Sequence, residues 1–295
     1  MLSRRFFLTL LLAGLVIAGP SQASGADRPD LVPALRDTTG SLPFDLHQGY
    51  GIVVRGSAGS LNDLNFFLDT GTIHSTFDSR IASELSLRDQ APAGLATLGG
   101  RVQAESAILP SLSIGSVQLS SLHIFTADLS PFEKVLFVRI DAIIGMDVLG
   151  LSPFVIDYTA RAIRFGASSA LPNSIPLRLD QGLAVFDAEI DNRPVHLLLD
   201  TGASSFVLFK TDSQSDSGAD HPAGRTPVSS GEIERKQVLL RDLKVGHAEF
   251  RQEPARTALN PKPSRIDADG LMSPAALGIS QLSVNLAKGV WSFSR

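Results

Sequence analysis

One short pattern occurs twice in the chain, at Phe66–Thr72 and again 131 residues later at Leu197–Ala203. Each copy is an apolar run that leads into an aspartate, a threonine and a glycine. A single copy fits equally well a glycine turn after a buried strand, with the aspartate as a local acceptor. Two copies can present Asp69 and Asp200 to one site, and paired carboxylates are suited to general acid and base chemistry.

The repetition extends beyond these two patterns. Leu112–Gly115 corresponds to Leu243–Gly246, also 131 residues away. Three further matches occur in the same order, and they pair Pro43–Val54 with Pro176–Asp187, Asp141–Gly150 with Asp269–Gly278, and Ile163–Phe165 with Trp291–Phe293. Matches that keep their order across both halves indicate a tandem duplication. The length of 295 residues suits two lobes of ordinary size.

With these motifs the chain resembles the aspartic proteases, as two retropepsin-like halves fused in the bilobal arrangement of pepsin-like enzymes. The resemblance covers the chain from about Leu42 onward. It implies an all-β fold of two double-psi, retropepsin-like β-barrel halves with a few short helices, related by a pseudo-twofold axis. It also implies an endopeptidase that acts on a protein or peptide substrate as a monomer, with Asp69 and Asp200 sharing a proton to activate water. No cofactor and no metal is expected.

The resemblance assigns supporting roles to the residues around the two aspartates. The residues expected to support the two turns are Thr70, Gly71, Thr72, Thr201, Gly202 and Ala203. The threonines after each aspartate would hydrogen-bond across the interface between the lobes, and the glycines would keep backbone close to the carboxylates. Thr72 has a hydroxyl where Ala203 has none, so Thr72 would favour ionised Asp69 and leave the shared proton on Asp200. The residues expected at the tips of hairpins that close over the substrate are Gly99, Gly100, Ser230 and Gly231.

The order of motifs divides the chain into segments. We expect a signal peptide over residues 1–23, a flexible lead over 24–41, a first lobe over 42–166, a linker over 167–175 and a second lobe over 176–295. Within the first lobe, strands over 50–55 and 64–68 flank a turn over 56–62. A short helix is expected over 79–87, capped by Asp78 or Ser79. In the second lobe, Asp191 and Asn192 form the turn of the corresponding hairpin.

The first residues predict export. Arg4 and Arg5 precede an apolar run over residues 8–18, and Ala23 ends a segment with small residues at positions suited to signal cleavage. The run Ser3–Leu8 resembles the twin-arginine motif, which carries folded bacterial proteins across the inner membrane. A general secretory signal that happens to contain paired arginines is the alternative. Either signal predicts an exported, periplasmic or secreted bacterial protein with no membrane anchor after cleavage.

Composition removes several other classes of function. The formal net charge is −4 and no basic stripe occurs, so nucleic acid is not an expected partner. The chain contains no cysteine, which excludes disulfides, thiolate catalysis and a lipid anchor on cysteine. The six histidines do not have the spacing of a metal site, and His74 and His196, near the aspartates, are expected on strand or turn flanks. No Gly-x-Ser-x-Gly elbow and no phosphate-binding loop occurs.

Two departures from the resembled pattern leave an alternative open. An apolar-apolar-Gly segment is expected behind each aspartate turn, and Ile143–Gly145 fits it, whereas Ser273 replaces the glycine in the second half. The second lobe would then be slightly distorted or would tolerate a small hydroxyl. Neither expected flap contains a tyrosine. The alternative is a non-catalytic periplasmic peptide-binding or assembly protein that kept the fold, since fold alone does not fix function.

Overall fold

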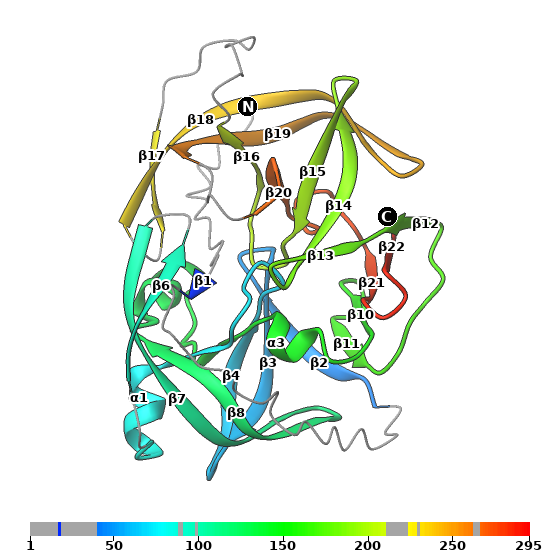
Figure 1. Cartoon of the computed structure of the whole chain (residues 1–295). Helices are drawn as coiled ribbons and strands as arrows, with labels where there is room; N and C mark the ends of the chain where they lie inside the picture. Colours follow the sequence, from blue (N-terminus) through cyan, green and yellow to red (C-terminus); the bar gives the residue numbers. More distant parts are fainter. Residues whose placement is uncertain are drawn as a thin grey trace, which may run out of the picture.

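The computed structural model describes residues 17–18, 40–87, 91–97, 100–210, 224–228, 231–261 and 266–295. In this part of the chain nearly all regular structure is β, as Figure 1 shows, with two lobes and a third group of strands between them. The expected signal cleavage site and most of the expected flexible lead lie outside the described residues. Of the expected signal segment, only the short strand β1 (Ile17–Ala18) is described, and it pairs with β6.

The first lobe is a strongly paired β structure with three short helices in its described residues. Its strands are β2 (Leu42–His47), β3 (Gly51–Ala58), β4 (Leu61–Leu68), β5 (Thr76–Asp78), β6 (Ala91–Thr97), β7 (Gly100–Ile114), β8 (Val117–Ala127) and β9 (Ala142–Ile144). Its helices are α1 (Ser79–Glu84), α2 (Ser130–Leu136) and α3 (Met146–Leu149). The expected helix is α1, and the Asp78 side chain caps it by accepting a hydrogen bond from the Arg80 backbone N–H.

The second lobe repeats this arrangement. Its strands are β13 (Arg178–Asp180), β14 (Leu183–Ile190), β15 (Arg193–Leu199), β16 (Phe206–Lys210), β17 (Gly224–Val228), β18 (Gly231–Val245), β19 (Ala248–Pro261) and β20 (Gly270–Met272). The expected hairpin turn is present between β14 and β15, where Asp191 and Asn192 both have positive φ, 50° and 63°. Two consecutive left-handed residues match the right-handed twist of the strands on either side.

The duplication is repeated in the strand pairing itself. In the first lobe β4 runs parallel to β9, with Leu68 beside Ile144, and in the second lobe β15 runs parallel to β20, with Leu199 beside Met272. The following strands repeat too, since β5 and β16 each pair antiparallel with that same neighbour and parallel with β8 or β19. The strand that ends at each aspartate therefore lies in the same topological place in both lobes.

A group of strands from both halves joins the lobes. These strands are β10 (Phe154–Asp157), β11 (Ala162–Phe165), β12 (Asn173–Pro176), β21 (Gln281–Asn285) and β22 (Val290–Ser294). The two halves meet where β10 pairs with β21, and β12, from the expected linker, pairs with β22. Residues 173–175 of the expected linker thus belong to a strand, and the rest is held by Ser169, which hydrogen-bonds with Ser283 and Ser292.

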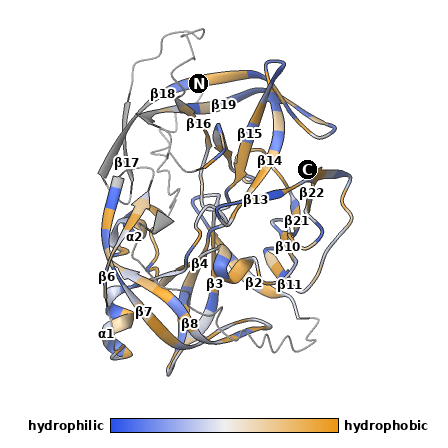
Figure 2. Ribbon diagram, in the orientation of Figure 1, coloured by the Kyte–Doolittle hydropathy of each residue, from blue (hydrophilic) through white to orange (hydrophobic). Residues whose placement is uncertain are grey.

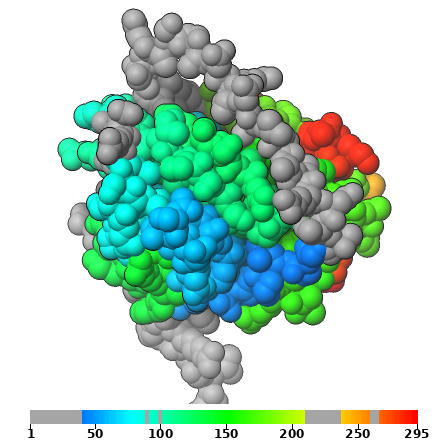
Figure 3. All heavy atoms as spheres, turned by 90° about the horizontal axis from the view of Figure 1, so that it is seen from below, coloured from blue at the N-terminus to red at the C-terminus, as the bar shows by residue number. Residues whose placement is uncertain are grey.

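The interior is apolar and continuous across this junction. Hydrophobic and hydrophilic residues alternate along the strands in Figure 2, which is the pattern of a sheet with one face toward a core. One core cluster extends through both lobes, and the completely buried Phe66 and Trp291 belong to it. Figure 3 shows the outer face of the first lobe, blue through green, with C-terminal residues in red at its edge.

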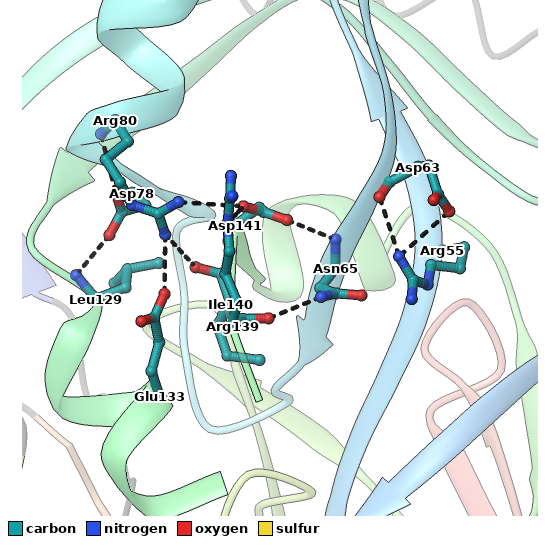
Figure 4. A network of polar contacts seen from close by, with 10 residues as sticks. All are labelled: Arg55, Asp63, Asn65, Asp78, Arg80, Leu129, Glu133, Arg139, Ile140 and Asp141. Carbon is teal, nitrogen blue, oxygen red and sulfur yellow. Dashed lines mark hydrogen bonds and ion pairs between the residues drawn. The ribbon is translucent and has the colours of Figure 1, made fainter. Parts of the chain in front are cut away.

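A polar network fixes the helices of the first lobe onto its strands (Figure 4). Arg80 contacts Asp78 at 2.8 Å, Glu133 at 2.8 Å and Asp141 at 3.7 Å. Asp141 also accepts hydrogen bonds from Arg139 at 2.8 Å and from the Asn65 backbone at 2.9 Å. Asp78 and Asp141 are buried while Arg80 is partly exposed, and these contacts, together with the hydrogen bond from the Leu129 N–H to Asp78, pair two carboxylates that are costly to bury without partners.

Candidate active site

The two repeated aspartates meet at the junction of the lobes. Each follows the last residue of its strand, and its backbone N–H donates to the neighbouring parallel strand, Asp69 to Ile144 and Asp200 to Met272, at 3.0 Å in both cases. Both side chains are completely buried. The structure thus brings together the two residues that the sequence singled out, in equivalent backbone settings.

Reciprocal hydrogen bonds between threonines lock the two turns together, as expected from the sequence. The Thr70 hydroxyl donates to the Leu199 carbonyl at 2.7 Å and accepts from the Thr201 backbone N–H at 3.0 Å. The Thr201 hydroxyl donates to the Leu68 carbonyl at 3.1 Å and accepts from the Thr70 backbone N–H at 3.1 Å. These four buried bonds relate the lobes by twofold symmetry, so neither turn can move independently.

The two glycines are required by close approach across the interface. The Gly71 N–H donates to Asp69 Oδ1 at 2.8 Å, and the Gly202 N–H donates to Asp200 Oδ1 at 2.9 Å. A Cβ on Gly71 would lie 2.5 Å from Cγ of Asp200, and a Cβ on Gly202 would lie 2.5 Å from Cγ of Asp69. Each glycine therefore makes room for the carboxylate of the opposite lobe, and no residue with a side chain fits there.

The outer carboxylate oxygens, Oδ2 of each aspartate, are not treated alike. Thr72 donates its hydroxyl to Asp69 Oδ2 at 2.8 Å. Ala203, at the corresponding place, has no hydroxyl, and Asp200 Oδ2 is buried with no hydrogen-bond partner among the described residues. The asymmetry expected from the sequence is therefore present in the hydrogen bonding.

This asymmetry is accompanied by different proton affinities. Burial raises the pKa of Asp69 to about 6, although the bonds from Thr72 and Gly71 act in the opposite direction. Burial raises the pKa of Asp200 well above its ordinary value, and the negative charge of Asp69 raises it further. A hydrogen bond between the two carboxyl groups lowers the pKa of Asp69 and raises that of Asp200. The shared proton therefore resides mainly on Asp200.

Each turn is supported from behind, but by different donors. In the first lobe the Met146 backbone N–H donates to the Thr72 carbonyl at 2.8 Å, and a Cβ on Gly145 would lie 2.8 Å from that carbonyl oxygen. In the second lobe the residue that follows Ser273 is Pro274, which has no N–H. The buried Ser273 hydroxyl instead donates to the Ala203 carbonyl at 2.6 Å.

Ser273 therefore does not distort the second lobe. Its hydroxyl makes the hydrogen bond that Pro274 cannot make, and the bond from Asp200 to Met272 has the same length as its counterpart. Of the two interpretations of this departure from the pattern, the structure supports tolerance of a small hydroxyl.

The first lobe adds a further carboxylate, which the sequence did not single out. Asp147 accepts hydrogen bonds from the Ser75 hydroxyl at 2.7 Å and from the Ser75 backbone N–H at 2.8 Å. Ser75 in turn accepts from the Gly145 N–H at 3.1 Å. Burial of the carboxyl group raises the pKa of Asp147 to about 6. Its partner lies 72 residues away, so only the mismatch between Asp147 and Ala275 in the repeat could have indicated a lobe-specific role.

The other expected residues occupy more ordinary places. The expected flap hairpins are β6–β7 and β17–β18, which begin their second strands at Gly100 and Gly231, while Gly99 and Ser230 lie outside the described residues. His74 packs edge-on against Phe125 at 5.3 Å, and burial followed by the charge of His123 lowers its pKa. His196 lies in β15 and contacts Asp187 at 2.7 Å. Both histidines lie on strand or turn flanks, as expected.

The described residues contain no group of three or more histidine, aspartate or glutamate side chains that could hold a metal ion. In the same residues no helix has the length and apolar character that crossing a membrane requires.

Comparison with known proteins agrees with this geometry. The family model described as aspartyl protease matches residues 54–148 and 186–280, one segment in each lobe and together more than half of the chain. The chain therefore belongs to the aspartyl protease family, with two family segments in one polypeptide, and is a peptide hydrolase.

Among solved structures, the crystal structure of a retropepsin-like aspartic protease from Rickettsia conorii matches 40% of this chain and 84% of its own, at 20% identity and a TM-score of 0.31. No curated protein matches.

Proposed function

We propose that this protein is an exported aspartic endopeptidase in which Asp69 and Asp200 together activate water for peptide-bond hydrolysis. The observation that carries the proposal is the reciprocal placement of the two buried carboxylates, each against the glycine of the opposite lobe. The family supplies the substrate class, a protein or peptide.

The proton distribution assigns a role to each carboxylate. Asp69 receives hydrogen bonds from Thr72 and Gly71, which favour its ionised form, so it is the base that takes a proton from water. Asp200 holds the shared proton and gives it to the oxygen of the scissile carbonyl. The water attacks the carbonyl carbon, and the tetrahedral intermediate collapses as Asp69 gives the proton taken from water to the leaving nitrogen, while ionised Asp200 takes back a proton from the hydroxyl that becomes the carbonyl of the product acid. Two aspartates that share one proton are a general property of aspartic proteases, because two like charges so close together cannot both form easily.

Access to the buried pair requires part of the fold to open, and we assign this movement to the hairpins β6–β7 and β17–β18. The outer part of the first hairpin packs through a small cluster that includes Leu95, Ala104 and Phe125, whereas Leu109 and Leu112 farther along β7 belong to the main core. An element with few contacts to the main core opens at lower free-energy cost than the core itself. The last described pairs of these hairpins are Thr97 with Gly100 and Val228 with Gly231.

Cleavage of a peptide library by the purified protein tests the proposed reaction. Wild type, Asp69→Asn and Asp147→Asn would be compared, because Asp147 is an aspartate of the same lobe outside the pair. Loss of cleavage in Asp69→Asn alone supports the proposal. Equal loss in both variants, or cleavage by Asp69→Asn, contradicts the assignment. A folded wild type that binds peptides without cleaving them would identify the binding or assembly protein instead.

Export is tested separately by Arg4→Lys combined with Arg5→Lys. The twin-arginine pathway recognises the guanidinium pair, which lysine does not reproduce, so precursor should accumulate in the cytoplasm. An unchanged rate of processing in the double variant would instead assign the leader to the general secretory route. Periplasmic fractionation of the wild type tests the location itself.

A further inference from the structure

The outer oxygens of the two aspartates differ in their hydrogen-bond donors. The outer oxygen of Asp69 receives the Thr72 hydroxyl, whereas no donor in the described residues has hydrogen-bond geometry to the outer oxygen of Asp200. A buried carboxylate oxygen without a donor is costly whenever that group is ionised. During the proposed reaction Asp200 gives up its proton and passes through its ionised form, so a donor is needed there.

Tyr50 has a buried hydroxyl donor that lacks an acceptor in the described part of the chain. Its side chain is 5% exposed, and its hydroxyl is buried without a hydrogen-bond partner among the described residues. The residue directly precedes β3, which pairs with β4, the strand that leads to Asp69. Its ring belongs to an apolar cluster that contains Phe67 and Phe132 and is bordered by Ala275 from the second lobe. Tyr50 thus lies between the aspartate strand and the second lobe.

The electrostatic environment of the phenol agrees with this position beside the aspartate strand. Burial raises the pKa of Tyr50, and the charges of Asp200 and then Asp69 raise it further. The charged groups that act on the phenol are Asp200 and Asp69, and both are acidic. The phenol therefore stays protonated, and able to donate a hydrogen bond, throughout the pH range in which the aspartates titrate.

We propose that Tyr50 is a positioning residue for Asp200, and that its hydroxyl supplies to Oδ2, through one water molecule, the hydrogen bond that Thr72 gives to Asp69. The second aspartate thus obtains its outer donor from the first lobe, because Ala203 in its own lobe has none. This inference rests on the proposed roles of Asp69 and Asp200.

The chain provides a matched control, because it has two tyrosines. The Tyr158 hydroxyl is also buried without a partner among the described residues, but burial alone raises its pKa, with no contribution from either aspartate. Its ring contacts Phe44 edge-on at 6.2 Å. Tyr158→Phe therefore makes the same chemical change in a similar environment without altering the aspartate pair.

The test is the dependence of kcat and of kcat/KM on pH for wild type, Tyr50→Phe and Tyr158→Phe. Loss of a donor to ionised Asp200 raises the higher pKa of the pair and makes Asp200 a weaker acid in the step in which it gives its proton to the carbonyl oxygen. Tyr50→Phe should therefore move the alkaline limb up by about one pH unit and lower kcat about tenfold. Tyr158→Phe should leave both unchanged. Thr72→Ala should move the acidic limb instead, because it acts on Asp69.

Rescue sharpens the test. Ala203→Ser in the Tyr50→Phe background places a hydroxyl where the first lobe has Thr72, and it should return the alkaline limb toward wild type. Superimposable profiles for wild type and a folded Tyr50→Phe overturn the proposal, and so does an equal shift in Tyr158→Phe. Thermal unfolding establishes that each variant is folded.

A measurement on the unaltered protein does not depend on activity or on the folding of a variant. Tyrosine labelled with ¹³C at Cζ gives two signals, which Tyr158→Phe assigns. The Tyr50 signal should follow the ionisation of the aspartate pair, and this response should change in Asp200→Asn, while the Tyr158 signal should stay constant. A constant Tyr50 signal overturns the positioning role. If wild type lacks peptidase activity but Tyr50 titrates as expected, only the proposed function fails.

Discussion

The two lobes hold the same aspartate turn with different chemistry. In the first lobe a backbone N–H from Met146 supports the turn, and the Ser75–Asp147 pair lies beside it. In the second lobe the support is the Ser273 hydroxyl, and Ala275 stands where the first lobe has Asp147. The comparison shows that the turn requires one donor to the carbonyl after its glycine, whatever the source. It also shows that only the first lobe has a titratable group behind its turn.

The largest expected effect tests whether the two aspartates are equivalent in catalysis. Asp69→Asn and Asp200→Asn should each lower kcat/KM about a thousandfold or more, because one group must take a proton and the other must give one. Both variants should fold, since asparagine is neutral in a site where burial disfavours a charge. Rates for both on one peptide provide the measurement. Substantial activity in either variant would show that one lobe suffices.

The threonine lock should respond symmetrically. Thr70→Val and Thr201→Val each remove two buried hydrogen bonds and leave a backbone N–H and a carbonyl without partners. Each should lower the free energy of unfolding by about 2–4 kcal/mol. Because the bonds are reciprocal, the double variant should lose less than the sum. Denaturant unfolding of the four proteins gives the coupling energy, and strictly additive losses would contradict a shared lock.

Acidity should distinguish the lobes. The pKa of Asp147 is about 6 in the folded protein and near 4 when unfolded, so the folded state binds its proton more tightly. The stabilisation is complete below about pH 4 and is lost as pH rises through about 6, at a cost on the order of 2 kcal/mol. Asp69 and Asp200 act in the same direction.

Unfolding free energies from pH 4 to pH 7 check this expectation. Wild type should become less stable as pH rises, and Asp147→Asn should show a smaller loss over the same range. If the slope for Asp147→Asn equals that of wild type, Asp147 is not a source of the pH dependence. Asp242→Asn, at an exposed position of the second lobe, serves as the control.

The smallest effect concerns Ser273. Ser273→Gly introduces the glycine found in the first lobe but leaves the buried Ala203 carbonyl without its donor, at a cost of about 1–2 kcal/mol. Adding Pro274→Met restores a backbone N–H and should recover most of the loss, because the pair then matches Gly145–Met146. Thermal unfolding of the three proteins decides the matter. A double variant no better than Ser273→Gly would show that the serine acts in another way.

Local chemistry made part of this fold predictable. The aspartate turns, the capped helix α1 and the Asp191–Asn192 turn all depend on residues adjacent in sequence. The turn expected over 56–62 is shorter in the structure, since β3 continues to Ala58 and β4 begins at Leu61. Gly56 lies inside β3, and only a glycine fits there because a Cβ would be 2.3 Å from the ring of Phe66. It is a packing glycine, and its partner is not visible from the local sequence.

The site was predictable to a similar extent. The repeated triplets identified both aspartates, their glycines and the crossing threonines, because each copy contains its own hydrogen-bonding groups. Tyr50 and the Ser75–Asp147 pair were not identified, since their importance depends on contacts between segments distant in sequence. The same holds for Ser273, whose hydroxyl reaches a carbonyl 70 residues away. Only the three-dimensional fold, which brings these distant segments together, reveals these roles.

The strands that join the lobes also have a consequence for how the chain folds. Val284 pairs with Phe154, and Phe293 pairs with Asn173, so each pairing closes a loop of more than a hundred residues. Contacts between such distant segments are slow to form, because the loss of chain entropy precedes the gain from pairing. The first half therefore lacks the strand that pairs with β10 while it emerges from the ribosome. The last strand pairing can form only after residue 293 has been synthesised. The lifetime of the partly assembled state therefore depends on the order of the segments along the chain, and it is separate from the stability of the finished fold.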